Sequence, residues 1–317
     1  RIHAARSSLC EAPMIHVIGL VSNLRPVLRA GGALLVSDGF EPQRTLAWLT
    51  DGALAVTHYV GVPQMMEAFR TQPGFDPAPL RRMTALVTGG APHAIDDILA
   101  WLADGVPMVG GFGMSEAGTV FGMSVELDVI RAKPGSVGIA APGIETRVVD
   151  GDGRVCAAGE AGELLLRGAS ITPGYWRNPL ETAKAFDRDG WFATGDIVRH
   201  DEDGFFWIVD RKKDMFISGG ENIYPAEIEA ALADHPGIAE CALVGLPDPR
   251  WGEAGWLAIV PADPGLQVDA VLAHLEQRLA RYKLPRRVVI VEALPRTATG
   301  KLQKAALKRW LVEPPTR

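Results

Sequence analysis

Two segments in the C-terminal third carry residue types suited to chemistry on a phosphate. Residues 210–229 read DRKKDMFISGGENIYPAEIE and place several charges and a glycine pair ahead of a helix that begins at a proline. Residues 295–304 read PRTATGKLQK and place the ammonium of Lys301 on a small, flexible Thr/Gly run. A compact positive charge on a glycine loop suits phosphoryl or nucleotidyl transfer, because negative charge develops on the phosphate. The two segments therefore favour an enzyme over a binding module.

The elements that must position these segments fall into three stretches. Apolar strand-like runs alternate with amphipathic helical runs in residues 1–128, which predicts an α/β layer. Short strands with Gly, Pro and Asp turns follow in residues 129–210 and predict an antiparallel sheet or a small barrel. Residues 211–317 predict a compact α+β domain, with helices over 225–237 and 268–285. The fold class is thus α/β, in two or three domains, as the length of 317 residues also indicates.

Composition excludes several classes of protein. The net charge of −6 argues against general nucleic-acid binding, although in residues 270–310 ten Lys or Arg face only two Glu. That surplus could receive an anionic ligand or form a solvated helix face. Cys10, Cys156 and Cys241 are odd in number and widely spaced, which predicts neither a disulfide framework nor a zinc site and favours a reducing cytoplasm. No apolar run approaches the roughly 18 residues of a membrane span, so no integral membrane segment is predicted.

The chain starts at Arg1 and runs directly into an apolar stretch, which predicts a fragment of a longer protein. No GxxxxGK[ST] phosphate loop occurs in it. We therefore expect the segment that holds a triphosphate to lie upstream of these residues.

Four motifs stand in the order found in one enzyme superfamily. They are GGFGMSEAG from residue 110, GWFATGDIV from residue 190, and the two segments at 210–229 and 295–304. With them, the chain resembles the C-terminal portion of an adenylate-forming acyl-CoA synthetase, a group that includes fatty-acid–CoA ligases, peptide-synthetase adenylation domains and luciferases. The resemblance implies the rest of a large AMP-binding domain in residues 1–210 and a mobile C-terminal domain in residues 211–317. It also implies ATP, Mg²⁺ and coenzyme A as reaction partners.

In this superfamily a carboxylate attacks the α-phosphate of ATP and forms an acyl adenylate, which a thiol then converts to a thioester. The resemblance implies that Ser115 contacts a phosphate oxygen and that Glu116 binds Mg²⁺. The resemblance also implies that the ring of Phe112 covers the adenine. It implies a backbone close to the nucleotide at Gly89, Gly90, Ala91, Gly111, Gly113 and Met114.

Residues of the C-terminal third receive complementary roles from the resemblance. Asp196 would bind the ribose hydroxyls, Arg211 the ribose or a phosphate, and Lys213 would be the hinge of a domain rotation. Lys301 would lie between the acid and the α-phosphate during adenylation. The resemblance implies that Gly219, Gly220 and Glu221 line a channel for the thiol arm of CoA. It implies that Trp251 belongs to a loop beside the nucleotide of CoA.

The acid is less clearly specified. The resemblance places the acid pocket at His16, Gly19, Val60, Gly61 and Met114. These residues include no Asp to hold an α-amino group, so a fatty, alicyclic or aromatic acid is favoured over an amino acid. A carrier protein as acceptor, a luciferase-like oxygenase and a non-catalytic binding module stay open as alternatives. The oligomeric state also stays open, with a homodimer as one option.

Overall fold

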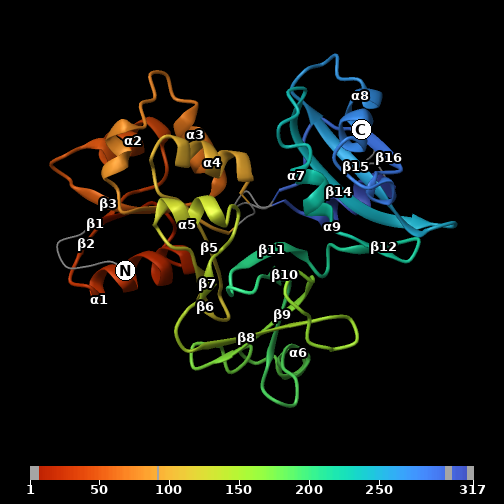
Figure 1. Ribbon diagram of the computed structural model, residues 1–317, viewed down its shortest axis with the longest axis horizontal. Helices are drawn as coiled ribbons and strands as arrows, with labels where there is room; N and C mark the ends of the chain where they lie inside the picture. Colours follow the sequence, from red (N-terminus) through yellow and green to blue (C-terminus); the bar gives the residue numbers. More distant parts are fainter. Residues whose placement is uncertain (1–6, 91–92, 297–301, 313–317) are drawn as a thin grey trace. The chain divides into compact units, whose positions relative to one another are not determined.

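The computed structural model describes residues 7–90, 93–296 and 302–312. Tertiary contacts divide the chain into two compact units. The first comprises Arg1–Thr194 and Val198–Ile208, and the second comprises Gly195–Ile197 and Val209–Arg317. Both units mix helices with sheets, which confirms the predicted α/β class (Figure 1). The division into an AMP-binding domain over residues 1–210 and a mobile C-terminal domain over residues 211–317 stays a prediction.

A seven-stranded sheet organises the N-terminal part of the first unit. Its strand order is β2-β1-β3-β4-β5-β6-β7, parallel from β2 to β5 and antiparallel from β5 to β7. The strands are β1 (Ser7–Cys10), β2 (Ala33–Val36), β3 (Val56–Gly61), β4 (Ala85–Thr88), β5 (Met108–Met114), β6 (Gly118–Gly122) and β7 (Ile139–Ala140). The connecting helices are η1 (Ile18–Leu24), α1 (Arg25–Arg29), α2 (Pro42–Thr50), α3 (Pro63–Arg70), η2 (Ala78–Arg82), α4 (Ile95–Ala103) and α5 (Leu127–Ala132).

Helices cover both faces of this sheet. Figure 1 shows α2, α3 and α4 on one side of the parallel strands and η1 with α1 on the other. Phe69 of α3 and Trp101 of α4 are fully buried against Tyr59 and Leu86 of the strands. Burial of each such side chain contributes about 1.5–3 kcal/mol to the stability of the fold, so this sheet is stabilised although its strands are short. The parallel strands read as nearly continuous apolar runs because neither face meets water.

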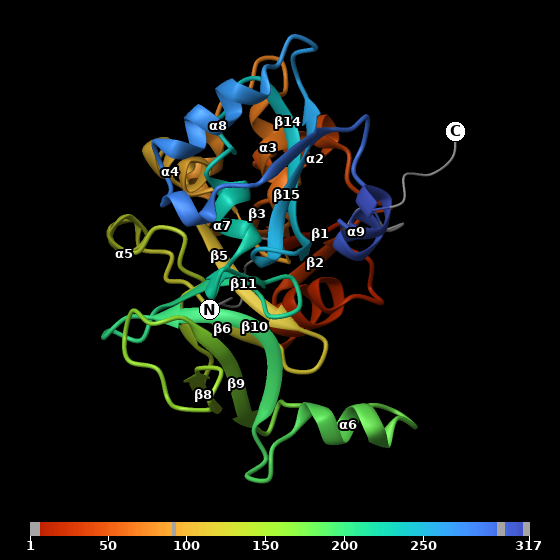
Figure 2. The same ribbon diagram turned by 90° about the vertical axis from the view of Figure 1, so that its right-hand side faces the viewer.

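A four-stranded sheet follows, and most of it belongs to the first unit, whereas its residues 195–197 and 209–211 belong to the second. Its order is β11-β10-β9-β8. The elements are β8 (Ile144–Val149), β9 (Gly162–Gly168), β10 (Phe192–His200), β11 (Phe206–Arg211) and the helix α6 (Pro179–Ala185). Figure 2 shows α6 extending away from these strands, and none of its residues is buried. The rings of Phe121 and Phe206 stack with centroids 4.4 Å apart in a core shared with β6.

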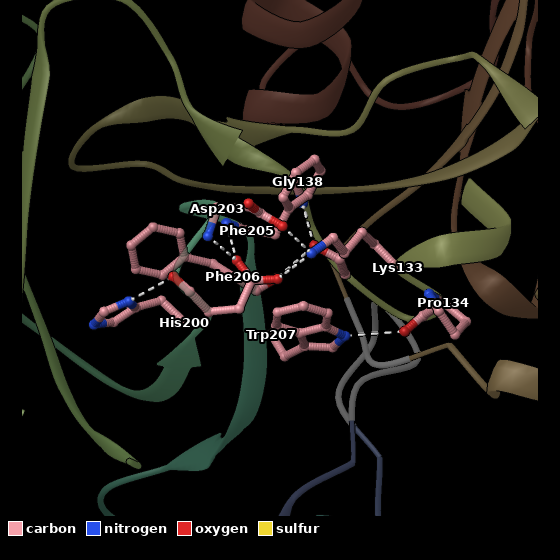
Figure 3. A network of polar contacts seen from close by, with 10 residues as sticks. Lys133, Pro134, Gly138, His200, Asp203, Phe205, Phe206 and Trp207 are labelled. Carbon is pink, nitrogen blue, oxygen red and sulfur yellow. Dashed lines mark hydrogen bonds and ion pairs between the residues drawn. The ribbon is translucent and has the colours of Figure 1, made fainter. Parts of the chain in front are cut away.

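A polar network joins the α5–β7 connection to the β10–β11 turn (Figure 3). The ammonium of Lys133 lies 2.6 Å from a carboxylate oxygen of Asp201 and 2.6 Å from one of Asp203. The indole of Trp207 donates a hydrogen bond of 2.9 Å to the carbonyl oxygen of Pro134. Burial raises the pKa of Asp201, but hydrogen bonds from Lys133 and from two backbone N–H groups outweigh it and hold that pKa below its ordinary value.

This network predicts a pH-dependent contribution to stability. We expect Lys133→Met to lower the urea midpoint of unfolding at neutral pH, because ionised Asp201 loses its cation. The loss should shrink as the pH falls through the depressed pKa of Asp201, since protonated Asp201 gains nothing from Lys133. Urea titrations at about pH 7 and about pH 3 measure the difference. A matched control is Lys184→Met, which removes an exposed ion pair with Glu181 and should change little at either pH. A loss for Lys133→Met that is equal at both pH values would contradict the assignment.

Gly138 lies where the two sheets of the first unit meet. It has φ +92°, and its backbone bridges to Phe206, with Phe206 N donating to Gly138 O at 2.9 Å. A Cβ at this position would overlap the carbonyl oxygen of Gly122.

We expect Gly138→Ala to reduce the free energy of unfolding by about 3 kcal/mol, the sum of backbone strain and overpacking. Gly143 is the control, because it has φ +84° but no neighbour within 4 Å. Gly143→Ala should cost only the left-handed strain of about 1–2 kcal/mol in the same urea titration. Equal losses for the two variants would show that the overlap at residue 138 relaxes without cost.

The second unit is built on a sheet of order β13-β12-β15-β14, with β16 parallel to β15. Its elements are β12 (Phe216–Ser218), β13 (Glu221–Ile223), α7 (Pro225–Ala230), β14 (Ile238–Asp248), β15 (Gly252–Pro261), α8 (Val268–Glu276), η3 (Arg281–Lys283), β16 (Arg287–Ile290) and α9 (Lys304–Val312). Alternation along β14 and β15 divides the core. Leu243 and Ile259 pack in the cluster with α7 and α8, whereas Val244 and Ala258 pack with Leu307 of α9.

Both helices predicted in this unit are shorter than the sequence pattern indicated. The prediction of one helix over 268–285 is wrong, because α8 ends at Glu276 and a separate 3-10 turn follows. Ala280 adopts ψ 143°, and Leu284 is extended as the residue before a proline must often be. The bend lets Leu279 and Leu284 both reach the core.

Among the helices that the structure describes, none has the length and apolar character to cross a bilayer.

Candidate functional site

The carboxyl ends of β3, β4 and β5 bring three predicted segments together. Gly61 pairs with Thr88, and Thr88 pairs with Gly110, in the parallel ladder. Gly89 donates its N–H to Gly61 O at 3.2 Å. A Cβ on Gly89 would lie 3.1 Å from Gly111 O, so backbone approaches backbone closely here. Ligands of open α/β sheets bind at this edge of the sheet, where the strands end.

The predicted acid-pocket residues lie beside the same edge. Gly90 has φ +82°, and a Cβ there would contact Ile18 of η1 and Val62 after β3. The half-buried His16 accepts a hydrogen bond of 3.2 Å from the N–H of Ile18 at Nδ1. Gly19 is buried in η1. The structure therefore places the segment around residues 16–19 and the end of β3 next to Gly90.

The glycines of the GFGMSE motif belong to a strand and not to a loop. Gly111, Phe112, Gly113 and Met114 form the end of β5, which turns into β6 through an exposed Ser115. A Cβ on Gly113 would lie 2.5 Å from the carbonyl oxygen of the paired strand, so only glycine fits. The ring of Phe112 lies 5.8 Å from that of Phe121, measured between centroids, and is half-buried. The hairpin turn between β5 and β6 presents Ser115.

Glu116 is held by residues that the sequence interpretation missed. Its backbone oxygen accepts from Thr172 N at 2.6 Å, and its Oε1 accepts from the hydroxyl of Tyr175 at 3.1 Å. Burial and the neighbouring carboxylate raise the pKa of Tyr175, which keeps the phenol a donor. The only signal in the sequence was a Gly-Tyr-Trp run far from Glu116. The contact fixes the orientation of the carboxylate beside the hairpin turn.

The donor set around Glu116 fits a magnesium ion that arrives with phosphates. In residues 7–90, 93–296 and 302–312 no group of three or more His, Cys, Asp or Glu could hold a metal ion. Mg²⁺ in nucleotide enzymes is commonly bound by one or two carboxylates and by substrate oxygens. One oriented carboxylate therefore suffices. The buried Oγ1 of Thr88 at the same edge has no hydrogen-bond partner in the described part of the chain, which suits a site completed by a ligand.

In the second unit, Asp196 and Arg211 form an ion pair. Arg211 Nε lies 2.9 Å from Asp196 Oδ1, and the carboxylate side chain is only 3% exposed whereas the guanidinium side chain is 57% exposed. Lys213, the predicted hinge, is exposed. The pair orients the carboxylate and leaves most of the guanidinium available to an anion.

The glycine pair of the second unit forms a tight hairpin turn. Gly219 has φ +62° and Gly220 has φ +90°, as the two central residues of a type I′ turn between β12 and β13 require. The ring of Trp251 lies against Gly219, where a Cβ would come within 2.8 Å of it. Glu221 follows the turn and is exposed. The structure thus brings Trp251 to the predicted thiol-channel loop.

Two guanidinium groups flank Trp251. Arg250 lies 4.8 Å and Arg286 lies 4.7 Å from the ring, measured to its centroid. The sequence indicated Arg286 only as one member of the basic surplus in residues 270–310. Such stacked, fixed cations suit a phosphorylated ligand. The remaining predicted residues, Ala91 and Lys301, lie outside the described residues.

Comparison with known proteins connects this geometry to enzymes. The chain is 39% identical over 303 residues to feruloyl-CoA synthase of Amycolatopsis sp, covering 95% of this chain and 61% of that protein. It is 40% identical over 298 residues to indoleacetate–CoA ligase of Aromatoleum aromaticum, covering 93% and 58%. The chain therefore spans about three fifths of the length of these relatives.

Solved structures and family models agree with these relatives. ATP-bound MatB from Rhodopseudomonas palustris superposes with a TM-score of 0.89 at 31% identity, covering 98% of this chain and 61% of that one. The o-succinylbenzoate CoA synthetase MenE from Bacillus subtilis, in complex with its acyl-adenylate intermediate, superposes with a TM-score of 0.87 at 28% identity, covering 96% and 60%. The model of the AMP-binding enzyme matches residues 2–176, and that of the AMP-binding enzyme C-terminal domain matches residues 227–301. By its sequence and by its fold, the chain is a member of the AMP-binding enzyme family.

Proposed function

We propose that the protein containing this chain activates a carboxylic acid with ATP and transfers the acyl group to coenzyme A. The observation that carries this proposal is the junction of three glycine-rich strand ends at Gly61, Gly89 and Gly111. Backbone approaches backbone between Gly89 and Gly111, where no side chain intervenes, so a nucleotide and an acid could reach this edge together. The names of the relatives, which are CoA synthases and ligases, support the same reaction.

The reaction has two steps. In the first, an oxygen of the acid attacks the α-phosphorus of ATP, the bond to the β-phosphate oxygen breaks, and pyrophosphate leaves. In the second, the sulfur of CoA attacks the acyl carbonyl, AMP leaves, and the thiol proton is lost. Both steps gain most from holding the reactants in line, since little covalent chemistry falls to the protein.

Each candidate residue takes one part of that task. The hydroxyl of Ser115 would hold a phosphate oxygen, while Glu116, oriented by Tyr175, would bind Mg²⁺. Bound Mg²⁺ would neutralise charge on the phosphates. Asp196, oriented by Arg211, would accept hydrogen bonds from the ribose hydroxyls. Lys301 would stabilise the charge that develops as the acid attacks.

The second unit would supply the site for CoA. The turn at Gly219 and Gly220 carries no side chains, so it could line a narrow passage for the thiol arm. Trp251, together with the neighbouring Arg250 and Arg286, would take the phosphorylated end of CoA. A rotation about Lys213 would separate the two steps.

The acid is proposed to be aromatic or fatty. A Cβ on Gly61 would lie 3.1 Å from the side chains of Tyr59, Met65 and Met66, so the surroundings of this glycine are largely apolar and closely packed. Apolar surroundings favour an acid with a hydrocarbon chain or a ring over an acid that carries a second charged group. Feruloyl and indoleacetate groups in the names of two relatives support a ring.

The test uses the protein expressed from its complete reading frame. It is incubated with ATP, Mg²⁺, CoA and a panel of aromatic, fatty and amino acids, and products are identified by mass spectrometry. Acyl-CoA with AMP is the expected result. Acyl adenylate that never reaches CoA would point to a carrier protein as acceptor, and an oxidised product formed in air would point to an oxygenase. Absence of any acid-dependent pyrophosphate release would overturn the proposal.

A further inference from the structure

We propose that Asn23 is a positioning residue for the acid, and that its buried side chain sets acid selectivity by holding the helical turn η1 against the proposed acid site. This inference rests on the proposed function, and it adds a residue that the sequence motifs do not indicate. Every contact that carries it lies within the first unit.

The turn η1 has an uncommon geometry. Ile18–Leu24 form a π-helix, and at its end the N–H of Arg25 donates to Leu20 O, five residues earlier. Single π-helical turns are rare and occur frequently at functional sites. Gly19 is buried in this turn, and a Cβ there would lie 2.5 Å from the carbonyl oxygen of Pro13. The turn is therefore packed closely against the chain that leads into it.

Asn23 ties this turn to the sheet from inside. The residue is fully buried. Its side-chain N–H donates a hydrogen bond of 3.2 Å to Ile18 O, and its Oδ1 accepts one of 2.9 Å from the hydroxyl of Ser8 on β1. Because a buried amide is costly unless its oxygen and its nitrogen are both bonded, these two contacts fix the side chain in one orientation. Asn23 therefore joins the start of η1 to β1.

Ile18 is the residue that Asn23 holds. Its carbonyl oxygen accepts from Asn23, and its N–H donates at 3.2 Å to Nδ1 of His16. Side chains thus hold both polar backbone groups of Ile18. Its own side chain reaches Gly90, where a Cβ would lie 3.6 Å from Cδ1 of Ile18. Asn23 and His16 therefore set the position of an apolar side chain at the edge where the acid is proposed to bind.

The same turn also contacts the hairpin that presents Ser115. A Cβ on Gly118 of β6 would lie 3.3 Å from Cγ1 of Val21, and the hydroxyl oxygens of Ser22 and Thr119 lie 3.3 Å apart. The turn η1 therefore lies between the proposed acid site and the proposed phosphate site. A displacement of this turn would move the acid relative to the α-phosphate.

Loss of Asn23 should affect the acid more than the nucleotide. Ile18 O would lose a donor and the hydroxyl of Ser8 would lose an acceptor, so the turn would no longer be tied to β1. A displacement of about 1 Å can cost about 100-fold in rate, and a bulky acid needs more of the site than a small one. The KM for ATP should change little, because pairing of β5 with β6 fixes the hairpin that presents Ser115.

The experiment uses Asn23→Ala, Ser8→Ala and Ile18→Ala in the complete enzyme, together with the double variant of Asn23 and Ile18. Acid-dependent pyrophosphate release gives kcat and KM for ATP and for a small and a bulky acid that the wild type accepts. The selectivity is the ratio of kcat/KM for the two acids. Thermal unfolding is recorded for each variant.

Arg70→Met is the control for lost stability. Arg70 ends α3 and pairs with Asp104 at 2.7 Å, just before β5 begins. Parallel strands begin at the edge of the sheet opposite to the one where they end, so this ion pair is remote from the proposed acid site. The variant should unfold at a lower temperature and keep the acid selectivity of the wild type.

We expect Asn23→Ala to raise the KM for the bulky acid and to change the selectivity at least about tenfold, with the KM for ATP near wild type. Ser8→Ala should change the selectivity in the same direction and by less, because Asn23 keeps its bond to Ile18. In the Ile18→Ala background, Asn23→Ala should add little further change, since both substitutions act through one side chain.

Unchanged selectivity in Asn23→Ala and Ser8→Ala, with only a lower unfolding temperature, would show that Asn23 serves stability alone. Full additivity in the double variant would also overturn the inference. If Asn23→Ala does not fold, Ser8→Ala decides between the two outcomes. A wild-type enzyme inactive with every acid would instead overturn the proposed function.

Discussion

Replacing Lys301 by alanine in the complete enzyme should slow acyl-adenylate formation by about 100- to 1,000-fold, the usual effect of removing one preorganised group that stabilises transition-state charge. The ammonium would face the phosphate only while the acid attacks, so the loss should fall on that step. Thioester formation from supplied acyl adenylate should proceed near the wild-type rate. Pyrophosphate exchange measures the first step, and acyl-CoA formation from synthetic adenylate measures the second.

The control for this prediction is Lys308→Ala, which removes an ammonium from α9 without touching the proposed reaction. It should leave both steps unchanged. Comparable losses in the two half-reactions of Lys301→Ala would refute a role confined to adenylation. A normal rate in both steps would remove Lys301 from the mechanism.

Replacing Gly220 by leucine should have the opposite effect. Gly220 is exposed, with φ +90° and no atom within 4 Å of a Cβ position, so a leucine side chain would project into free space from the hairpin turn. If the thiol arm of CoA passes there, the side chain obstructs it, and a displaced nucleophile costs about 100-fold in thioester formation. Pyrophosphate release should persist, because the first step does not use this turn.

Backbone strain must be separated from obstruction in this variant. Gly220→Ala imposes the same left-handed conformation, at about 1–2 kcal/mol, but adds only a methyl group. We expect it to be destabilised like Gly220→Leu in thermal unfolding and to retain most of its thioester formation. If the alanine variant loses as much thioester formation as the leucine variant, strain in the turn is the cause. A normal thioester yield from Gly220→Leu would refute the channel.

Lys301 and Gly220 belong to two different segments of the second unit. Lys301 lies in the segment between Arg296 and Leu302, whose ends form a β-bridge, and Gly220 lies in the turn between β12 and β13. Both segments belong to one compact unit, so one substitution in each can be compared without changing the first unit. Opposite patterns of loss would support a reaction that uses the two segments in succession.

Much of the fold could be predicted from the sequence because its signals are local. Alternating apolar runs identified the parallel strands of the first unit, and paired glycines identified the turn at Gly219 and Gly220. The pattern failed over residues 268–285, where continuous helical periodicity hid a bend at Ala280. Periodicity reports which side chains face a core, but packing of Leu284 and the proline after it decided where the helix stopped.

By itself, the sequence determined the family, the order of the motifs and the residue types at the candidate site, because short-range spacing specifies each of these. Only the tertiary structure decided which distant residues meet. Tyr175 orients Glu116, Arg286 flanks Trp251, and Lys304 pairs with Glu229. Strand order and register set such contacts, and they depend on pairing across long loops that no local pattern encodes. The motifs therefore identified the family, whereas the contacts that hold the candidate residues in place became visible only in the folded chain.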